Sequence, residues 1–200
     1  MELYCIRHGQ SEANAADIHH GWGETKLSEL GRSQAIKAGE LLQHIKFDYV
    51  ISSDLLRARQ TAELALPAYT CQLDSRIREY GVGSLNGRRV EDCMREDGEP
   101  YLKAFNENDF SAYGGESPAM VSQRISEFMH ELEQKEAGLY KDCRIAIVGH
   151  AGSIRHIAYY VLGCNMHKEQ MLIDNCSLSR FRFKEGSWTL CLWNYSWSIE

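Results

Sequence analysis

The sequence lacks any long apolar run and any excess of positive charge. No run approaches the roughly 18 apolar residues that a membrane-spanning helix needs, so we expect no membrane span. Acidic residues outnumber basic ones, 28 to 22, which gives a net charge of −6. Because phosphate backbones and anionic lipid surfaces are bound by clustered Lys and Arg, we expect neither nucleic acid nor a membrane as a partner. This balance still permits one small basic pocket.

Cysteine pairs of the metal or redox type are also missing. No two cysteines have the C-x2-C spacing that is typical of zinc and dithiol sites. Because the chain also shows no N-terminal basic region followed by an apolar core, we expect no signal peptide and predict a cytoplasmic protein. We interpret the seven cysteines as reduced structural residues in a reducing compartment; they are Cys5, Cys71, Cys93, Cys143, Cys164, Cys176 and Cys191.

Proline is scarce, and no low-complexity linker divides the chain. Only three prolines occur, and strand and helix signals alternate along the length. We therefore predict one domain over residues 1–200. The alternation predicts an α/β fold, namely a three-layer sandwich with a mostly parallel central sheet.

Local patterns give the expected elements of this fold. Strand signals cover 3–6, 48–53, 71–73 and 144–148, and helical signals cover 28–45, 55–66, a long segment from 118 onward, and 149–163. Residues 177–183 and 188–193 alternate as a closing β-hairpin. Asp54 is a candidate cap for the second helix, Ser117 and Pro118 begin the third, and Gly163 ends the fourth. The first helix has a predicted core stripe of Leu30, Ala35, Ala38, Leu41, Leu42 and Ile45.

The segment from about 88 to 114 differs from the rest of the chain. It is polar, acidic and irregular, with GEP and GG as interruptions. We predict that it forms a small, partly helical cap over the main body.

Two of the buried strands end in a histidine beside small residues. The first strand runs into Arg7-His8-Gly9, and another runs into Gly149-His150-Ala151. Ligands of open α/β sheets bind beyond the carboxyl ends of the strands. If the two strands are neighbours, both imidazoles lie at one point, where backbone N–H groups can also approach a ligand.

Further polar residues fit an anion at this point. Arg7, Arg57 and Asn14, together with helix N-terminal donors, are suited to a phosphoryl dianion. Each residue also has a structural alternative: a histidine at a strand end is often structural, Arg57 alone reads as a solvated helix residue, and Glu79 alone reads as a surface ion pair. The residues taken singly leave this choice open. The remaining histidines are interpreted as structural or solvated: His19, His20, His44, His130, His156 and His167.

Ordered motifs decide between these readings. RHGQSEAN, GWGETKLSELGRSQA, SSDLLRARQTAE, IREYGVGSLNG, GGES, VGHAGSIR and NCSLSRFRF follow one another over nearly the whole chain. In this order they resemble the histidine phosphatase superfamily, which includes the cofactor-dependent phosphoglycerate mutases and many phosphatases.

The resemblance implies a phosphohistidine mechanism. His8 matches the nucleophile, and Arg7, Arg57 and His150 match the cationic pocket around the phosphoryl group. Asn14 and the Ala151 backbone match additional donors, and Glu79 matches the proton donor that later activates water. No metal and no cofactor are implied, because the arginines supply the positive charge. We further expect His8 to attack as a neutral imidazole, with protonated His150 among the charges that keep it neutral.

The chain departs from the family pattern at Glu24-Thr25-Lys26-Leu27, where the family often has Asp-x-Pro-Leu, and we expect this loop to be placed differently. Two other departures favour hydrolysis over mutase activity. The chain reads Glu79-Tyr80-Gly81-Val82-Gly83 where the mutases resemble E-R-H-Y-G. The cap is also shorter than in typical mutases, and a mutase must keep water from the phosphohistidine. Arg88 and Arg89 are candidate contacts for a second anionic group, although a solvated helix start is the favoured explanation for them.

The sequence therefore predicts a metal-independent phosphomonoesterase of the phosphatase branch, acting on a small phosphorylated metabolite. A cofactor-dependent phosphoglycerate mutase is the first alternative, and a non-catalytic phosphate-binding protein is the second. The presence of His8, Glu79 and His150 together speaks against the second. The aromatic tail from Leu192 to Ile199 is either a partner surface, compatible with a homo-oligomer, or a segment that packs on the body.

Overall fold

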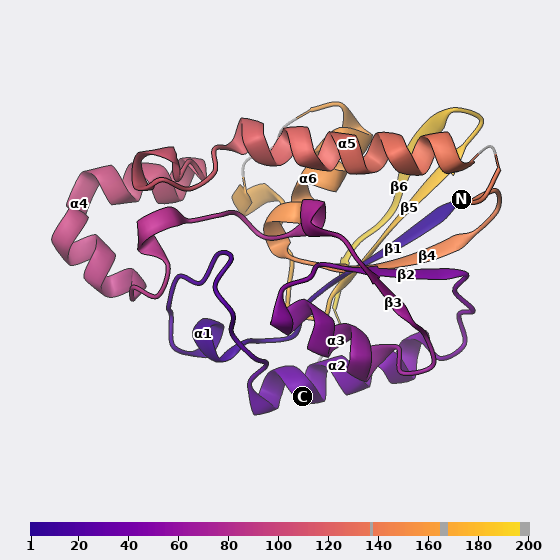
Figure 1. The fold of residues 1–200 in the computed structure, drawn as a ribbon, viewed down its shortest axis with the longest axis horizontal. Helices are drawn as coiled ribbons and strands as arrows, with labels where there is room; N and C mark the ends of the chain where they lie inside the picture. The colour runs from indigo at the N-terminus through magenta and orange to yellow at the C-terminus, as the bar shows by residue number, and fades with distance from the viewer. Residues whose placement is uncertain (137, 165–167, 197–200) are drawn as a thin grey trace.

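The central sheet has six strands in the order β3-β2-β4-β1-β5-β6 (Figure 1). The structure is a computed structural model that describes residues 1–136, 138–164 and 168–196. Strands β1 to β4 run parallel to one another, and β5 and β6 form an antiparallel hairpin beside β1. The strands are β1 Glu2–Arg7, β2 Tyr49–Ser52, β3 Cys71–Leu73, β4 Arg144–Gly149, β5 Leu178–Lys184 and β6 Ser187–Tyr195.

Helices cover both faces of this sheet. One face carries α2 and α3, and the other carries α5 and α6 (Figure 1). The predicted α/β sandwich with a mostly parallel sheet is thereby confirmed. The helices are α1 Glu12–Ala15, α2 Glu29–Leu42, α3 Leu56–Ala65, α4 Val90–Glu107, α5 Pro118–Glu136 and α6 Ala151–Leu162. No helix in the described ranges is long and apolar enough to cross a membrane.

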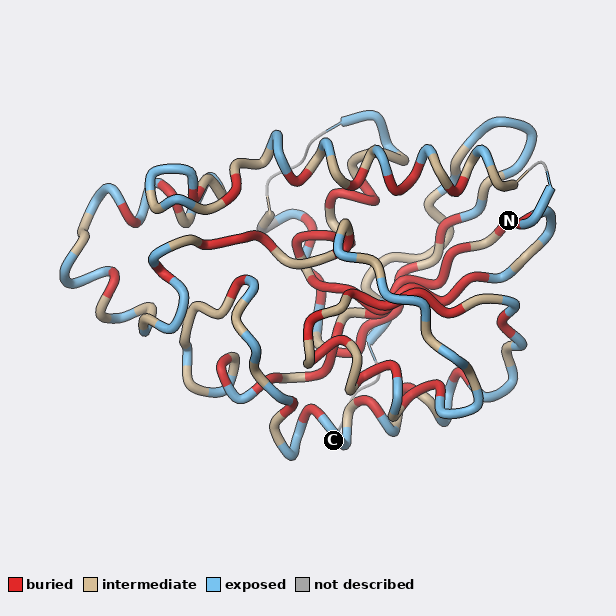
Figure 2. Tube along the Cα trace, in the orientation of Figure 1, coloured by how far each residue is buried: buried red, intermediate tan, exposed pale blue. Residues whose placement is uncertain are grey.

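The core lies along the two central strands, β1 and β4 (Figure 2). Residues 145–148 of β4 have no solvent exposure, and Leu3 and Cys5 of β1 are equally buried. A parallel strand covered on both faces is apolar throughout rather than alternating. This explains why LYCI and IAIV were the clearest strand signals in the sequence.

The predicted core stripe of α2 is partly wrong. Leu30 and Leu41 are 45% and 41% exposed. The helix instead buries Gly31, Ala35, Ala38 and Leu42. Small residues let α2 lie close to the sheet and to α3, so the larger side chains remain at the margin of the contact.

The predicted cap of α3 is also wrong. The residue before the helix is Leu55, and no side chain caps it. Asp54 instead accepts two hydrogen bonds from Arg78, at 2.7 Å from Nε and 2.5 Å from Nη2. A bidentate guanidinium satisfies this carboxylate better than a helix N–H group would. The predicted start of α5 at Pro118 and the end of α6 at Gly163 are confirmed.

The segment predicted as a cap contains a longer helix than its composition suggests. Helix α4 covers Val90–Glu107 and is broken at Gly98, which has φ +57°, just before Pro100. It lies at the end of the molecule remote from β3 and β6 (Figure 1). Its four glutamates are exposed, while Cys93, Tyr101 and Ala104 are buried.

Candidate active site

The carboxyl ends of β1 and β4 bring His8 and His150 together. The strands pair in parallel, with Ile6 opposite Val148 and Arg7 opposite Gly149. The two imidazole rings that follow have centroids 4.9 Å apart. Both side chains are almost completely buried, and His8 N donates to Gly149 O at 2.9 Å. The convergence expected from the two strand ends is therefore present.

His8 is held as a neutral imidazole with a defined tautomer. Its Nδ1 lies 2.7 Å from Gly9 O, and since a carbonyl oxygen only accepts, we assign the ring proton to Nδ1. Burial, then the charges of Arg57 and Arg7, lower the pKa of His8 well below its usual 6.5. The lone pair is therefore on Nε2, the form that a nucleophilic imidazole needs.

His150 is neutral too, which corrects the expectation of a protonated partner. Its Nε2 lies 2.9 Å from Ser53 Oγ. Burial and the Arg57 charge lower the pKa of His150 well below 6.5. The neutrality of His8 therefore comes first from burial and then from the two guanidinium groups, because a charged ring is disfavoured away from water.

Arg57, which is fully buried, and Arg7, which is half-buried, supply the positive charge beside His8. Arg7 Nη1 donates to Ile173 O at 2.6 Å, and Arg57 donates to Gly21 O and Gly23 O at 2.8 and 3.2 Å. Among the described residues, the buried Nε–H groups of both arginines have no hydrogen-bond partner. Burial lowers the pKa of Arg57 to about 10 and that of Arg7 below its usual value. Buried donors without partners cost free energy unless a ligand accepts from them.

The carboxylate of Glu79 lies at the N-terminus of α6. Its Oε1 accepts from Tyr80 N at 3.0 Å and from Gly152 N at 3.1 Å. A Cβ at residue 152 would lie 2.0 Å from this oxygen. Only glycine at this position allows the carboxylate to reach the helix end, so the glycine of the HAG motif serves Glu79.

The main chain of Glu79 is braced by residues that the sequence did not indicate. Arg124 donates to Glu79 O at 3.0 Å and pairs with Glu116, whose Oε1 lies 2.9 Å from Arg124 Nε. Trp22 Nε1 donates to the same carbonyl at 2.8 Å. These contacts join segments that are far apart in the sequence, so no local sequence pattern could have predicted them.

A pocket of about 420 Å³ opens above these groups. Arg7, Asn14, Glu79 and Ala151 line it, so the pocket brings together predicted site residues from three motifs, whereas the predicted residues His8, Arg57 and His150 are not among its lining residues. Asn14 Oδ1 accepts from Ser11 N at 3.1 Å, which leaves the Asn14 amide N–H groups to donate. Ala151 is the first residue of α6, where helix N–H groups lack intrahelical partners. We call Arg7, His8, Arg57 and His150 the floor of the site; of these four, Arg7 alone lines the pocket.

The cap forms the other side of the pocket. We call Val90, Phe105, Asn108 and Phe110 the outer wall. His19 and His20, which the sequence left as structural or solvated, also line the pocket. Burial lowers the pKa of His20 to about 4. The loop that carries these two histidines folds over the floor. Two adjacent histidines in a sequence do not by themselves predict that position.

Arg88 and Arg89, the candidate contacts for a second anionic group, do not line this pocket. Arg88 pairs with Asp97 at 2.7 Å and with Glu96 at 3.0 Å. Arg89 Nη1 donates to Ala16 O at 3.4 Å. Arg155 and Lys168 are the cations that line the side of the pocket instead.

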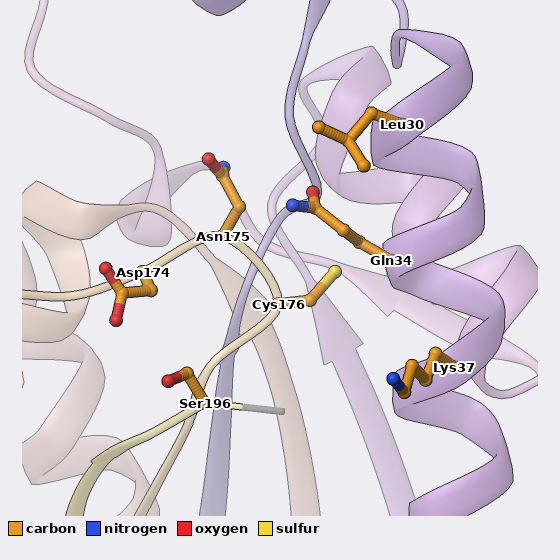
Figure 3. Close-up of a pocket in the computed structure, with 7 residues that line it drawn as sticks. All are labelled: Leu30, Gln34, Lys37, Asp174, Asn175, Cys176 and Ser196. Carbon is orange, nitrogen blue, oxygen red and sulfur yellow. The ribbon is translucent and has the colours of Figure 1, made fainter. Parts of the chain in front are cut away.

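A second hollow, of about 410 Å³, lies between α2 and the 174–176 loop (Figure 3). None of the predicted site residues that line the first pocket lines this one. Asn175 Nδ2 donates to His8 O at 2.9 Å, and Cys176 N donates to Arg7 O at 3.0 Å. This loop therefore holds the end of β1 in place.

The described residues contain no group of three or more His, Cys, Asp or Glu side chains that could hold a metal ion. The seven cysteines, all of which lie in the described ranges, are unpaired. The positive charge beside His8 comes from Arg7 and Arg57.

These features define an α/β protein with a histidine pair and buried guanidinium groups at the carboxyl edge of its sheet. The chain belongs to the histidine phosphatase superfamily, branch 1, whose family model matches residues 3–196.

Relatives with both phosphatase and mutase names resemble the chain. A probable phosphoglycerate mutase GpmB of Salmonella paratyphi A is 30% identical, over 96% of this chain and 90% of the relative. A mycobacterial glucosyl-3-phosphoglycerate phosphatase, solved with VO3, superposes with a TM-score of 0.87 and 28% identity, over 98% of this chain and 99% of the other. A putative alpha-ribazole-5'-P phosphatase of Escherichia coli gives a TM-score of 0.85 and 27% identity, over 100% and 99% of the two chains.

Proposed function

We propose that the protein is a metal-independent phosphomonoesterase that hydrolyses a small phosphorylated metabolite through a phosphohistidine on His8. The observation that carries this proposal is the neutral His8 beside the unpartnered Nε–H groups of Arg7 and Arg57. A phosphoryl dianion satisfies both arginines and brings its phosphorus to the imidazole. Preplaced donors of this kind stabilise the charge that develops during phosphoryl transfer.

The reaction then follows from the placement of Glu79. His8 Nε2 attacks phosphorus, and the P–O bond to the leaving alcohol breaks. Glu79 gives its proton to that oxygen. In the second half, Glu79 takes a proton from water, which attacks the phosphohistidine and releases phosphate. Asn14, His150 and the Ala151 N–H are proposed to bind the phosphoryl oxygens.

Mass spectrometry of rapidly quenched reactions, kept away from acid, tests the covalent step. Phosphate is expected on His8 during turnover and absent from His8→Ala. Label on another side chain, or none while phosphate is released, contradicts the proposal. Activity is expected to persist after dialysis against EDTA, and loss restored by a divalent cation contradicts metal independence.

Mutase activity is the second candidate, because a relative with 30% identity is named a phosphoglycerate mutase. Against it, residues 80–83 read Tyr-Gly-Val-Gly and lack the Arg that the mutase pattern has after the glutamate. Incubation with 3-phosphoglycerate and catalytic 2,3-bisphosphoglycerate separates the two. Fast isomerisation with little phosphate release would favour the mutase. We further propose that the protein is cytoplasmic and contacts neither nucleic acid nor membrane, and a homo-oligomer stays a prediction.

A further inference from the structure

Tyr80, His156 and Ser122 form a hydrogen-bonded chain that the proposed reaction does not use. Tyr80 Oη lies 2.6 Å from His156 Nε2, and Ser122 Oγ lies 2.9 Å from His156 Nδ1. Tyr80 and His156 are both buried, with 6% and 5% exposure. The chain joins the residue after Glu79 to α6 and to α5, so it connects three segments that are far apart in the sequence.

The His156 ring is fixed on both sides. Both of its nitrogens have a partner, and its centroid lies 5.6 Å from that of Tyr80 and 5.2 Å from that of Tyr159. Burial, followed by the charges of Arg124 and Arg155, lowers the pKa of His156 to about 4. A neutral imidazole donates from one nitrogen and accepts at the other, so the ring satisfies one hydroxyl on each side. A buried polar chain whose members all have partners is rigid.

The ring of Tyr80 lies beside the Glu79 carboxylate at the start of α6. A Cβ at Gly152 would lie 2.0 Å from Glu79 Oε1 and 2.7 Å from Tyr80 Cδ2, so the carboxylate and the ring edge border the same small space. After burial, the Glu79 charge is the largest influence that raises the pKa of Tyr80 above its usual 10. Both side chains line the pocket of about 420 Å³. A rotation of the Tyr80 ring would therefore change the space beside the carboxylate.

This packing matters because the carboxylate is bound through the backbone. Tyr80 N donates to Glu79 Oε1 at 3.0 Å, and Gly152 N donates to the two carboxylate oxygens at 3.1 and 3.2 Å. In the described ranges, no side chain donates a hydrogen bond to this carboxylate or forms an ion pair with it. Two N–H donors hold the carboxylate at one edge, so its tilt depends on the side chain packed against it.

The hydroxyl of Tyr80 is bound away from the pocket. His156 and Ser122 do not line the pocket that contains Glu79; they line a separate hollow of about 360 Å³. Phe110 of the outer wall also packs against the Tyr80 ring, with the centroids 5.9 Å apart. The hydroxyl therefore fixes the ring and is not available to contact the leaving group.

We propose that Tyr80, fixed by His156, is a positioning residue that sets the orientation of the Glu79 carboxylate for proton transfer to the leaving oxygen. Proton transfer needs the two oxygens at hydrogen-bond distance and in line, so a small tilt of the carboxylate slows it. This inference rests on the proposed function, because it takes Glu79 as the proton donor.

A comparison of leaving groups separates this role from a structural one. Tyr80→Phe keeps the ring and removes the hydroxyl, and His156→Phe keeps a buried ring and removes both hydrogen bonds. Each variant is expected to lower kcat about 10-fold for an alkyl phosphate that the wild type hydrolyses, because its leaving oxygen needs the proton. For nitrophenyl phosphate kcat should fall less than about 2-fold, and KM for either ester should change less than about 2-fold.

A double variant and a conservative variant test the link between the two residues. If His156 acts only through the Tyr80 hydroxyl, Tyr80→Phe combined with His156→Phe should lose no more than either change alone, because the effects of residues in direct contact are not additive. His156→Gln has an amide that can still bond the hydroxyl, and it is expected to keep more of the alkyl phosphate rate than His156→Phe.

Tyr160→Phe is the matched control. It removes a hydroxyl from the same helix, where Tyr160 donates to Glu133 Oε1 at 2.8 Å, and it should leave the ratio of alkyl to nitrophenyl rates unchanged. An unchanged alkyl phosphate rate in Tyr80→Phe, equal losses for both esters, a change confined to KM, or additive losses in the double variant would each overturn the inference. Phospho-His8 formed from nitrophenyl phosphate in these variants would still establish the proposed function, whereas its absence from the wild type would contradict that function instead.

Discussion

The floor and the outer wall of the pocket are built in opposite ways. His8 and His150 follow the two most buried strands, and backbone hydrogen bonds fix both. The outer wall comes from α4, which breaks at Gly98 and is followed by Asn108 in a left-handed conformation, and from Phe110 just beyond it. Substitutions in the floor would disturb the sheet, whereas the outer wall belongs to a segment outside the sheet. The difference teaches that the reaction and the choice of substrate depend on separate parts of the chain.

Removing the nucleophile is the most severe test of the floor. His8→Ala is expected to lower turnover of every phosphomonoester by about 10⁴-fold or more, because no covalent route remains. Phosphate release with an aryl and an alkyl phosphate measures this. His44→Ala, on the exposed surface of the chain, should retain full activity. Substantial residual turnover in His8→Ala would break the division between floor and wall.

The proton donor should distinguish leaving groups. Glu79→Gln keeps an oxygen for Gly152 N but has no proton to transfer, so alkyl phosphates are expected to lose about 10²- to 10³-fold. A nitrophenyl phosphate, whose leaving group needs no protonation, should lose far less. Rates for a series of esters of graded leaving-group acidity give the comparison. An equal loss of rate for every ester would show that Glu79 only helps to position groups in the site and does not donate the proton.

Arg57 connects the positive charge of the floor with the pH dependence of catalysis. Because the pKa of His8 lies well below 6.5, the acid limb of kcat/KM is expected below pH 6.5. Arg57→Ala removes a positive charge that opposes protonation of His8, so the acid limb should move to higher pH. Activity should also fall about 100-fold and inhibition by vanadate should weaken.

Arg57→Lys separates these effects from misfolding, since it retains the charge in the same buried position. It should restore the position of the acid limb more fully than the rate, because an ammonium group lacks the Nε–H geometry of the guanidinium. An unchanged acid limb and unchanged vanadate inhibition in Arg57→Ala would place Arg57 outside the phosphoryl site.

The smallest effect is expected from the outer wall. Phe105→Leu retains apolar bulk but loses the aromatic ring below Lys168. Values of KM should change by about 2- to 5-fold and by different factors for different esters, as is usual for changes in pocket shape. A panel of phosphorylated metabolites measures this. The same factor for every ester would show that the wall affects the reaction as a whole.

The sequence predicted most of the floor because its signals are local. Apolar strands followed by RHG and GHAG are visible without any knowledge of the fold. Glu79 and Arg57 required the ordered motifs, because each alone reads as an ordinary surface residue. Arg57 in fact has no solvent exposure. Nothing in the sequence LLRARQ indicates that Arg57, rather than Arg59, is the arginine that becomes fully buried.

The residues that the sequence missed act through long-range contacts. His20 reaches the pocket through a folded loop, and Arg124 reaches Glu79 from a helix 45 residues away. Leu30 and Leu41 have the spacing of core residues, yet α2 packs through small residues and Leu42. Periodicity predicts that a helix is amphipathic, but the width of the available gap decides which side chains fill it.

The cap leaves and re-enters the body at neighbouring points. Glu116 N donates to Gly81 O at 2.7 Å, and Gly81 N donates to the Glu116 carboxylate at 2.8 Å. A Cβ at Gly83 would lie 1.9 Å from Tyr113 O, so the two crossings are in close contact. An insertion closed at its base in this way can lengthen, shorten or be replaced during evolution without altering the strands. Transplanting residues 84–112 between members of the superfamily is accordingly a direct route to chimeras that keep one chemistry and acquire another specificity.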